Sequence, residues 1–282
     1  MIYKAELFGN EKYGLGEGPC YDPGSGRLSW VDITAGKMWQ MNASGERTSF
    51  DLGQQIGAAV PVKDSDGFVL CATDGLYLYE SGKAELVLNL KGLFKPYLRC
   101  NDAKADPAGR LWFGSSVSDD HPAEGNLYML EKGRPVIRQA DTKISNGLAW
   151  SSNRKTFFFS DSLKYAVFAY DHDPETGEIS GCRELFGAEN GVTDGLCIDS
   201  EDDLWVAYWG GRRVEHRSGR TGELLDVIDV PAEHVTSCCF GGEDLGTLFI
   251  TTSGDGLSGE FDGCLFTCRP GVKGVGPDRV IL

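Results

Sequence analysis

The sequence has no apolar run that approaches the roughly 20 residues of a membrane-spanning helix. Residues 1–8 lack the basic, apolar and small-residue regions of a secretory signal, so we expect a cytoplasmic protein. Positive charge is scarce, because 27 lysines and arginines stand against 42 aspartates and glutamates. The net charge of −15 disfavours binding to nucleic acids or to anionic membranes, and is compatible with cationic or neutral ligands.

Two common kinds of site are also missing. The nine cysteines form no regular disulfide framework, and no second Cys/His pair has the spacing of a structural zinc site. The adjacent Cys238 and Cys239 would point to opposite faces of a strand, so we expect free thiols throughout. A Gly-x-Ser-x-Gly nucleophile motif does not occur, and His172, His216 and His234 have the surroundings of turn or strand residues.

An internal repeat is the main feature that is present. Each copy contains a turn-like start, a short apolar strand, an Asp/Ser/Gly turn and a second apolar or aromatic strand. The copies begin at Glu17, Gly57, Asn101, Asn146, Asp194 and Ser237, at spacings of 40, 44, 45, 48 and 43 residues, and the copies at Gly57 and Ser237 match the phrase less closely than the other four. Six copies at this period predict an all-β, six-bladed β-propeller with four-stranded blades, formed by residues 1–282 as a single domain. Residues 2–8 could pair with the last blade and close the ring.

Equivalent positions of a repeat occupy equivalent places in each blade, and the innermost strands surround a narrow channel. Four of the six first positions carry carboxylate or carboxamide oxygens: Glu17, Asn101, Asn146 and Asp194. Converging carboxylates are costly to desolvate unless a cation lies between them, and oxygen ligands suit Ca²⁺, Mg²⁺ or Mn²⁺. Taken singly, Asn-Gly and Asp-Gly would be read as turns. Their shared phase in four of six repeats favours a metal site on the axis.

The sequence also resembles the SMP-30-like family, which includes gluconolactonases, senescence marker protein and luciferin-regenerating enzymes. The phrases that carry the resemblance span residues 16–252 and occur in the family's order. They are Gly16-Glu-Gly-Pro19, Arg99-Cys-Asn-Asp102, Asp106-Pro-Ala-Gly-Arg-Leu-Trp-Phe-Gly114, Ser145-Asn-Gly-Leu-Ala-Trp150, Thr193-Asp-Gly-Leu-Cys-Ile-Asp199, Leu204-Trp-Val-Ala-Tyr-Trp-Gly-Gly211, Thr236-Ser-Cys-Cys-Phe-Gly-Gly242 and Leu248-Phe-Ile-Thr-Thr252.

The resemblance implies one divalent metal ion, held by Glu17, Asn146 and Asp194. Ca²⁺ is favoured, and Zn²⁺, Mn²⁺, Mg²⁺ and Fe²⁺ are alternatives. Arg99 and Asn101 correspond to substrate-contacting residues of the family. The family's acidic residue that holds sugar hydroxyls falls near Asp119. This segment departs locally from the family pattern, so two other acidic residues compete for the role, Asp120 and Glu124. The loop 115–125, which includes His121, is a candidate rim or lid of the site. We expect substrate specificity to depend on rim loops around Tyr97, Asp119 and Tyr208-Trp209.

The implied activity is hydrolysis of a small sugar lactone, such as a glucono-, xylono- or arabinonolactone, by a monomer. A divalent metal polarises the carbonyl and lowers the pKa of water. Asp194 is the candidate general base, and attack by metal-bound hydroxide is the alternative. Arg99 and Asn101 would position the lactone. Competing functions are a metal-dependent esterase or phosphotriesterase, a non-enzymatic calcium-binding propeller, and a lyase of the strictosidine-synthase kind, which Glu17 and Asp194 together disfavour.

Overall fold

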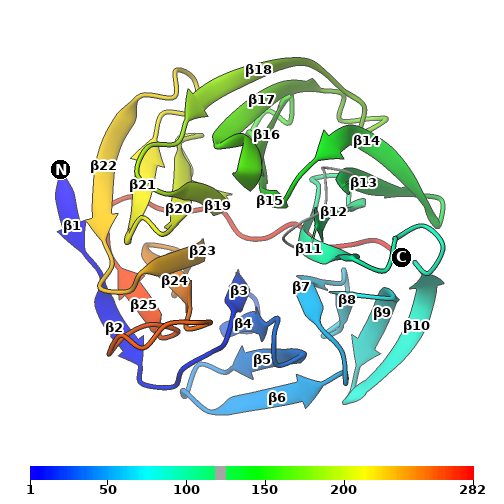
Figure 1. Ribbon diagram of the computed structural model, residues 1–282, viewed down its shortest axis with the longest axis horizontal. Helices are drawn as coiled ribbons and strands as arrows, with labels where there is room; N and C mark the ends of the chain where they lie inside the picture. Colours follow the sequence, from blue (N-terminus) through cyan, green and yellow to red (C-terminus); the bar gives the residue numbers. More distant parts are fainter. Residues whose placement is uncertain (118–124) are drawn as a thin grey trace.

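The computed structural model describes residues 1–117 and 125–282, and its six β-sheets are arranged in a ring, one for each repeat (Figure 1). These residues form 25 strands and one 3-10 turn, η1 (Ser162–Lys164). The predicted all-β, six-bladed propeller is confirmed.

Each blade is described from its innermost strand outward. The first contains β3 (Gly16–Asp22), β4 (Arg27–Asp32), β5 (Lys37–Met41) and β6 (Arg47–Asp51). The second contains β7 (Ile56–Pro61), β8 (Phe68–Ala72), β9 (Gly75–Glu80) and β10 (Lys83–Asn89). The third contains β11 (Leu98–Ala105), β12 (Leu111–Val117), β13 (Gly125–Glu131) and β14 (Arg134–Thr142).

The other three blades follow in chain order. The fourth contains β15 (Ser145–Trp150), β16 (Thr156–Asp161), β17 (Ala166–His172) and β18 (Ile179–Gly187). The fifth contains β19 (Val192–Ile198), β20 (Leu204–Trp209), β21 (Arg213–Arg217) and β22 (Leu224–Asp229). The sixth contains β23 (His234–Gly241), β24 (Thr247–Ser253) and β25 (Leu265–Cys268), and its outermost strand is β2 (Glu6–Gly9).

All six innermost strands have a register shift against the second strand, at or beside the first residue of the repeat. Glycines permit the neighbouring inner strands to approach here. A Cβ atom on Gly147 would lie 2.7 Å from the backbone nitrogen of Leu196, and one on Gly195 would lie 2.1 Å from Oγ of Ser237. The Asn-Gly and Asp-Gly pairs therefore belong to bulged strands, so their interpretation as turns is wrong.

The third and fifth blades share a contact that explains part of the repeated phrase. In each, an aspartate after the inner strand accepts hydrogen bonds from backbone N–H groups of the following turn. Its second oxygen accepts a hydrogen bond from a buried indole: Trp112 Nε1 donates to Asp106 at 3.0 Å, and Trp205 Nε1 donates to Asp199 at 2.9 Å. An aspartate six residues before a tryptophan thus joins the turn between the first two strands of the blade to the tryptophan of the second strand.

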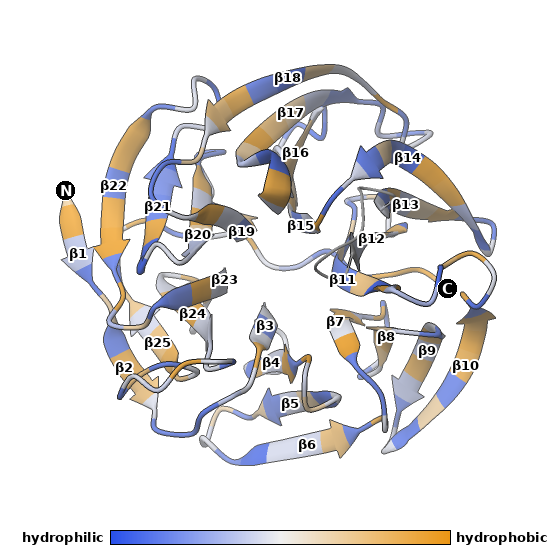
Figure 2. Cartoon of the chain, in the orientation of Figure 1, coloured by the Kyte–Doolittle hydropathy of each residue, from blue (hydrophilic) through white to orange (hydrophobic). Residues whose placement is uncertain are grey.

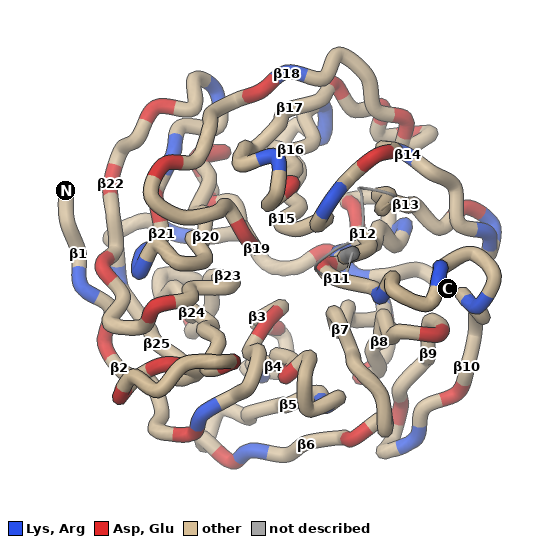
Figure 3. Tube along the Cα trace, viewed as in Figure 1, with Lys and Arg blue, Asp and Glu red and all other residues tan. Residues whose placement is uncertain are grey.

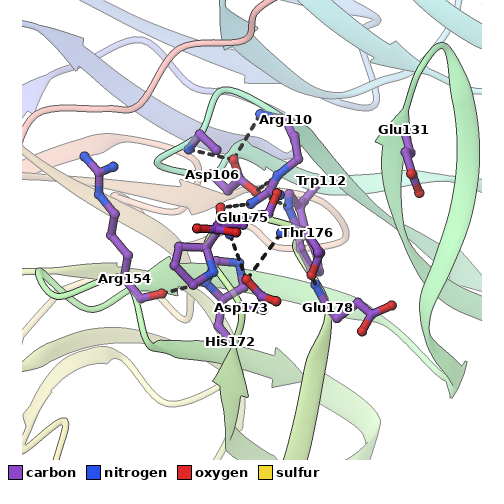
Figure 4. Close-up of polar contacts among 12 residues, drawn as sticks. Asp106, Arg110, Trp112, Glu131, Arg154, His172, Asp173, Glu175, Thr176 and Glu178 are labelled. Carbon is purple, nitrogen blue, oxygen red and sulfur yellow. Dashed lines mark hydrogen bonds and ion pairs between the residues drawn. The ribbon is translucent and has the colours of Figure 1, made fainter.

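Arg110 links the third blade to the fourth (Figure 4). Its Nε donates to Asp106 Oδ2 at 2.6 Å, and its two terminal nitrogens donate to the carbonyl oxygens of Glu175 and Pro174 at 2.9 and 3.0 Å. The side chain thereby joins the turn before β12 to the turn between β17 and β18. Asp106 also accepts a hydrogen bond from Trp112, so one carboxylate is bonded both to the core of the third blade and to the side chain that reaches the fourth.

The ring is closed by both ends of the chain. Strand β2 pairs antiparallel with β25, as predicted for closure of the last blade, whereas β1 (Ile2–Lys4) pairs parallel with β22 of the fifth blade. The C-terminal segment crosses the ring behind the inner strands (Figure 1). It forms bridges from Gly274 to Asp199 and from Val280 to Val62, so it connects the fifth blade to the second.

The outermost strands mix hydrophilic and hydrophobic residues (Figure 2). Acidic residues lie around the rim and also on the inner strands β3, β11 and β19, near the centre of the ring (Figure 3). All nine cysteines are free thiols, as expected, and the sulfur atoms of Cys197 and Cys238 lie 3.6 Å apart. Within residues 1–117 and 125–282, no helix has the length and apolarity needed to cross a membrane.

Candidate functional site

The four oxygen-bearing repeat positions line one cavity together. Asn101, Asn146 and Asp194 lie inside the bulges of β11, β15 and β19, and Glu17 comes directly before the bulge of β3. The four residues are only 4–7% exposed, and all of them line a cavity of about 700 Å³. A bulge turns a side chain out of the regular alternation of a strand. Each of these four side chains lies in or next to such a bulge.

The other two first positions contribute no carboxylate or carboxamide. A Cβ atom on Gly57 would lie 2.4 Å from the carbonyl oxygens of Cys100 and Asn101, so the second blade packs closely on the third at this level. Ser237 packs in the same way against Gly195. The oxygen-bearing side chains consequently come from the first, third, fourth and fifth blades.

The wall of the cavity contains part of the predicted rim. Tyr97 and Trp209 line it, and the indole of Trp209 stacks on the His234 ring with centroids 4.0 Å apart. Tyr208, which we also expected at the rim, is instead completely buried, with the Arg213 guanidinium 3.9 Å from its ring centroid. Four further residues of the predicted rim lie outside the described residues, including the predicted substrate contact Asp119: Asp119, Asp120, His121 and Glu124.

A chain of hydrogen bonds runs through the site. Arg99 Nη1 donates to Asn101 Oδ1 at 2.6 Å. Asn101 Nδ2 donates to the Ser145 carbonyl oxygen at 2.9 Å and to Asn146 Oδ1 at 3.1 Å. Asn146 Nδ2 donates to Ser162 Oγ at 2.8 Å. Both hydrogens of the Asn101 amide are thus used within the protein, while Arg99 occupies one of the two lone pairs of its oxygen.

Three carboxyl groups gather near the axis. Burial raises the pKa of Glu17 to about 8, and the charge of Asp102 adds to the rise. Burial likewise raises the pKa of Asp194 well above its usual value, and Glu17 and Asp102 contribute further. Burial raises the pKa of Asp102 too, although the ammonium group of Lys104 opposes this. Desolvation and mutual repulsion both disfavour ionised groups here, and a bound cation would relieve both.

Two further aspartates support the strands that carry the site, and they were not among the predicted site residues. The Asp32 carboxylate, at the end of β4, accepts hydrogen bonds at 2.9 and 3.1 Å from the backbone N–H groups of residues 14–15, which lead into β3. The Asp161 carboxylate, at the end of β16, accepts hydrogen bonds at 3.2 Å from residues 143–144, which lead into β15. Each fixes the entry of a strand that carries a candidate ligand.

The donor set fits a hard divalent cation. Glu17 and Asp194 provide carboxylate oxygens, and Asn146 provides a carboxamide oxygen that faces the same space as Asn101. The described part of the chain has no cluster of three or more His, Cys, Asp or Glu side chains placed to hold a metal ion, so a metal site here would need the carboxamide oxygen of Asn146 as a ligand. Oxygen donors of this mixed kind suit Ca²⁺ and related ions.

Comparisons of the sequence and of the fold with known proteins all point to the same family. The profile of the SMP-30/gluconolactonase/LRE-like region matches residues 15–254. The chain is 35% identical to regucalcin of Gallus gallus over 292 aligned positions, covering 97% of both chains. It is 34% identical to a candidate sugar lactone lactonase of Bacillus subtilis strain 168, covering 85% of this chain and 83% of that protein. A calcium-binding protein, regucalcin, of Agrobacterium tumefaciens superimposes with a TM-score of 0.93 at 26% identity, covering 100% of this chain and 99% of the other.

Proposed function

The chain belongs to the SMP-30/gluconolactonase/LRE-like family, and we propose that it is a divalent-metal-dependent hydrolase that opens small sugar lactones. The observation that carries the proposal is that Glu17, Asn146 and Asp194 come from three different blades and line the same cavity of about 700 Å³. The candidate sugar lactone lactonase and the calcium-binding regucalcin among the similar proteins support this proposal. The substrates we propose are aldonolactones of the glucono-, xylono- and arabinono- type.

In this proposal Glu17, Asn146 and Asp194 hold the cation through their oxygen atoms. Ca²⁺ is favoured by the all-oxygen donor set, with Zn²⁺, Mn²⁺, Mg²⁺ and Fe²⁺ as alternatives. A divalent cation bound there polarises a substrate carbonyl and lowers the pKa of water. The positive charge of the ion would then offset the desolvation and the mutual repulsion of the two buried carboxylates.

Side chains of the protein supply the general base and orient the substrate. An Asp194 carboxylate oxygen takes a proton from the attacking water, whose oxygen bonds to the carbonyl carbon of the lactone. The ring C–O bond then breaks and the departing oxygen takes up the proton, so lactone and water give a hydroxy acid. Arg99 lines the cavity and orients the substrate as a donor. Asn101 is suited to accept a substrate hydroxyl through its Oδ1, since its amide hydrogens are already used.

The walls of the cavity suit a small, partly polar ring. Thr34, Gln55, Thr73 and Ser116 provide polar groups, while Trp209 provides an apolar face. We further propose that the protein acts in the cytoplasm as a monomer, and that residues 1–282 form one domain, because strands from both ends of the chain close the ring.

An assay of metal-depleted protein tests the proposal. Hydrolysis of a panel of aldonolactones, followed by acid release, is expected to vanish after chelation and to return on addition of Ca²⁺ or Mn²⁺. Simple aryl esters and a phosphotriester in the same assay test the competing hydrolase function. A protein that binds the ion yet hydrolyses none of these compounds would contradict the enzymatic proposal and favour a calcium-binding protein.

A further inference from the structure

Ser162 connects two candidate ligands that come from different blades. It follows β16 directly, at the first position of η1, and is only 5% exposed. Its Oγ accepts a hydrogen bond from Asn146 Nδ2 at 2.8 Å and donates one to the carbonyl oxygen of Thr193 at 2.8 Å. Thr193 immediately precedes Asp194 on β19. One hydroxyl therefore touches the side chain of one candidate ligand and the backbone beside another.

The number of protons in this contact determines how Asn146 is oriented. A serine hydroxyl has a single hydrogen, and Ser162 gives it to Thr193, whose carbonyl can only accept. Toward Asn146 the hydroxyl can then act only as an acceptor, so the carboxamide must present its NH₂ group to Ser162. The opposite orientation would bring two acceptors together in a buried place, which costs the desolvation of both.

The oxygen end of the Asn146 carboxamide is also held by a hydrogen bond, and that bond agrees with the orientation set by Ser162. With Nδ2 directed at Ser162, Oδ1 is directed to the side where Asn101 donates to it at 3.1 Å. A carbonyl oxygen has two lone pairs, and this contact uses one of them. The second is left for a cation in the cavity that Asn146, Glu17 and Asp194 line.

We propose that Ser162 is a positioning residue for the divalent cation. It directs the Oδ1 atom of Asn146 toward the ion, and its hydrogen bond to Thr193 holds the β19 backbone beside Asp194 next to Asn146. The inference rests on the cation site of the proposed function. Ser162 lines the cavity, and its role in this proposal is to position Asn146 and not to bind the ion: its one proton goes to Thr193, and one of its two lone pairs accepts from Asn146.

Substitution of Ser162, with a neighbouring serine as control, tests this role. Ser162→Ala is expected to weaken Ca²⁺ binding about 10–100-fold by calorimetric titration, the usual effect of losing an outer-sphere partner of a ligand. Ser162→Thr keeps the hydroxyl and is expected to restore most of the affinity. Ser160→Ala is the matched control: Ser160 lies two residues earlier, on β16, is fully buried, and donates to Thr193 Oγ1 at 2.9 Å, but has no contact with Asn146 among its hydrogen bonds. Its Ca²⁺ affinity is expected to stay within about threefold of the unsubstituted protein.

The outcomes separate this inference from the proposed function. Unchanged Ca²⁺ affinity in Ser162→Ala, or an equal loss in Ser160→Ala, would overturn the positioning role. An unsubstituted protein that binds no divalent cation would overturn the site and this inference together. A protein that binds Ca²⁺ but hydrolyses no lactone would overturn only the enzymatic proposal, because the titration needs no turnover. If Ser162→Ala does not fold, Ser162→Cys, which keeps the size and weakens the hydrogen bonds, gives the same comparison.

Discussion

Asn101 of the third blade donates a hydrogen bond from Nδ2 to Oδ1 of Asn146 in the fourth blade, at 3.1 Å. The same amide group also donates to the Ser145 carbonyl oxygen, and its oxygen accepts from Arg99. A residue that the family resemblance predicts as a substrate contact is therefore also joined to a candidate ligand. This double attachment determines what its removal should do.

Asn101→Ala is expected to lower turnover more than it lowers cation affinity. The lost contact to Asn146 should weaken the bound ion about tenfold, while the loss of a positioning group should reduce the rate about 10²–10³-fold. Saturating metal would then restore only part of the activity. Bound metal and lactone hydrolysis are measured on the same sample. Complete recovery of the rate by added metal would show that Asn101 acts through the ion alone.

Asp194→Ala is expected to remove the tightly held ion and to reduce hydrolysis by about 10²–10⁴-fold, because one side chain is proposed as both ligand and base. Asp255→Ala is the matched control, since Asp255 lines the same cavity but is exposed and away from the inner strands. Metal content by atomic emission and hydrolysis of an aldonolactone report the result. If metal content and turnover both survive in Asp194→Ala, the axial site is wrong.

Chelation is expected to lower the unfolding temperature while the propeller remains folded. An ion at a hundredfold excess over its dissociation constant contributes about 2.7 kcal/mol. In a protein of this size, that corresponds to roughly 5–10 °C. Scanning calorimetry with and without chelator measures the shift, and Asp194→Ala should show none. A melting curve that is unchanged after verified removal of metal would contradict the linkage.

His216, which is not among the residues that line the candidate cavity, is expected to make part of the stability dependent on pH. Its Nδ1 lies 2.9 Å from Asp226 and its Nε2 3.3 Å from Asp199, with Asp203 at 3.9 Å and the ring stacked on Trp205. Burial lowers the pKa of His216, but the hydrogen bonds and charges of Asp199 and Asp226 outweigh it, so the pKa lies above 6.5.

A raised pKa stabilises the folded state at pH values below the unfolded pKa, and this contribution is lost as the pH rises through the folded pKa. His216→Gln should therefore cost about 1 kcal/mol more near pH 5.5 than near pH 8.5. The pKa values of Asp199 and Asp226 are lowered, so both stay ionised over this range. Urea unfolding of both proteins at the two pH values gives the difference. An equal cost at both would show that His216 contributes only packing.

The indole of Trp209 is expected to bind the apolar face of the lactone ring. It lines the cavity and is backed by His234, whose ring fixes its orientation. Trp209→Ala should raise KM about threefold to tenfold with a smaller change in kcat, and Trp209→Phe should lose less, since an aromatic contact contributes about 0.5–1.5 kcal/mol. Steady-state kinetics with a single aldonolactone measures both constants. A fall in kcat alone would contradict a binding role.

The repeat was sufficient to predict the ring because its residues meet the same physical requirement in several blades. Asp106 and Asp199 hold a tryptophan six positions later, and Gly147 and Gly195 admit the next inner strand. Such constraints recur at a fixed spacing, so they are visible in one sequence. The shared position of Glu17, Asn146 and Asp194 followed from the same phase, whereas their role as ligands stays a prediction.

Other features depend on contacts that leave no periodic pattern. Ser162 acts through neighbours on β15 and β19, and a serine after a strand carries no signal by itself. Asp32 and Asp161 do share a position, at the end of the second strand, and this repetition could have indicated them. The parallel pairing of β1 with β22 joins segments more than 220 residues apart in sequence and involves only three residues, too few to show a pattern.

The way the ring closes also sets an order of events on the ribosome. Strands β1 and β2 emerge before any other part of the described structure, but their partners β22 and β25 are among the last strands to be made. Gly9 and Leu265 are 256 positions apart, so at about 5–20 residues per second β2 has no native partner for on the order of ten to fifty seconds. During synthesis β2 therefore stays unpaired while five blades are made, and the sheet edge that will receive it exists only after β25 has been made.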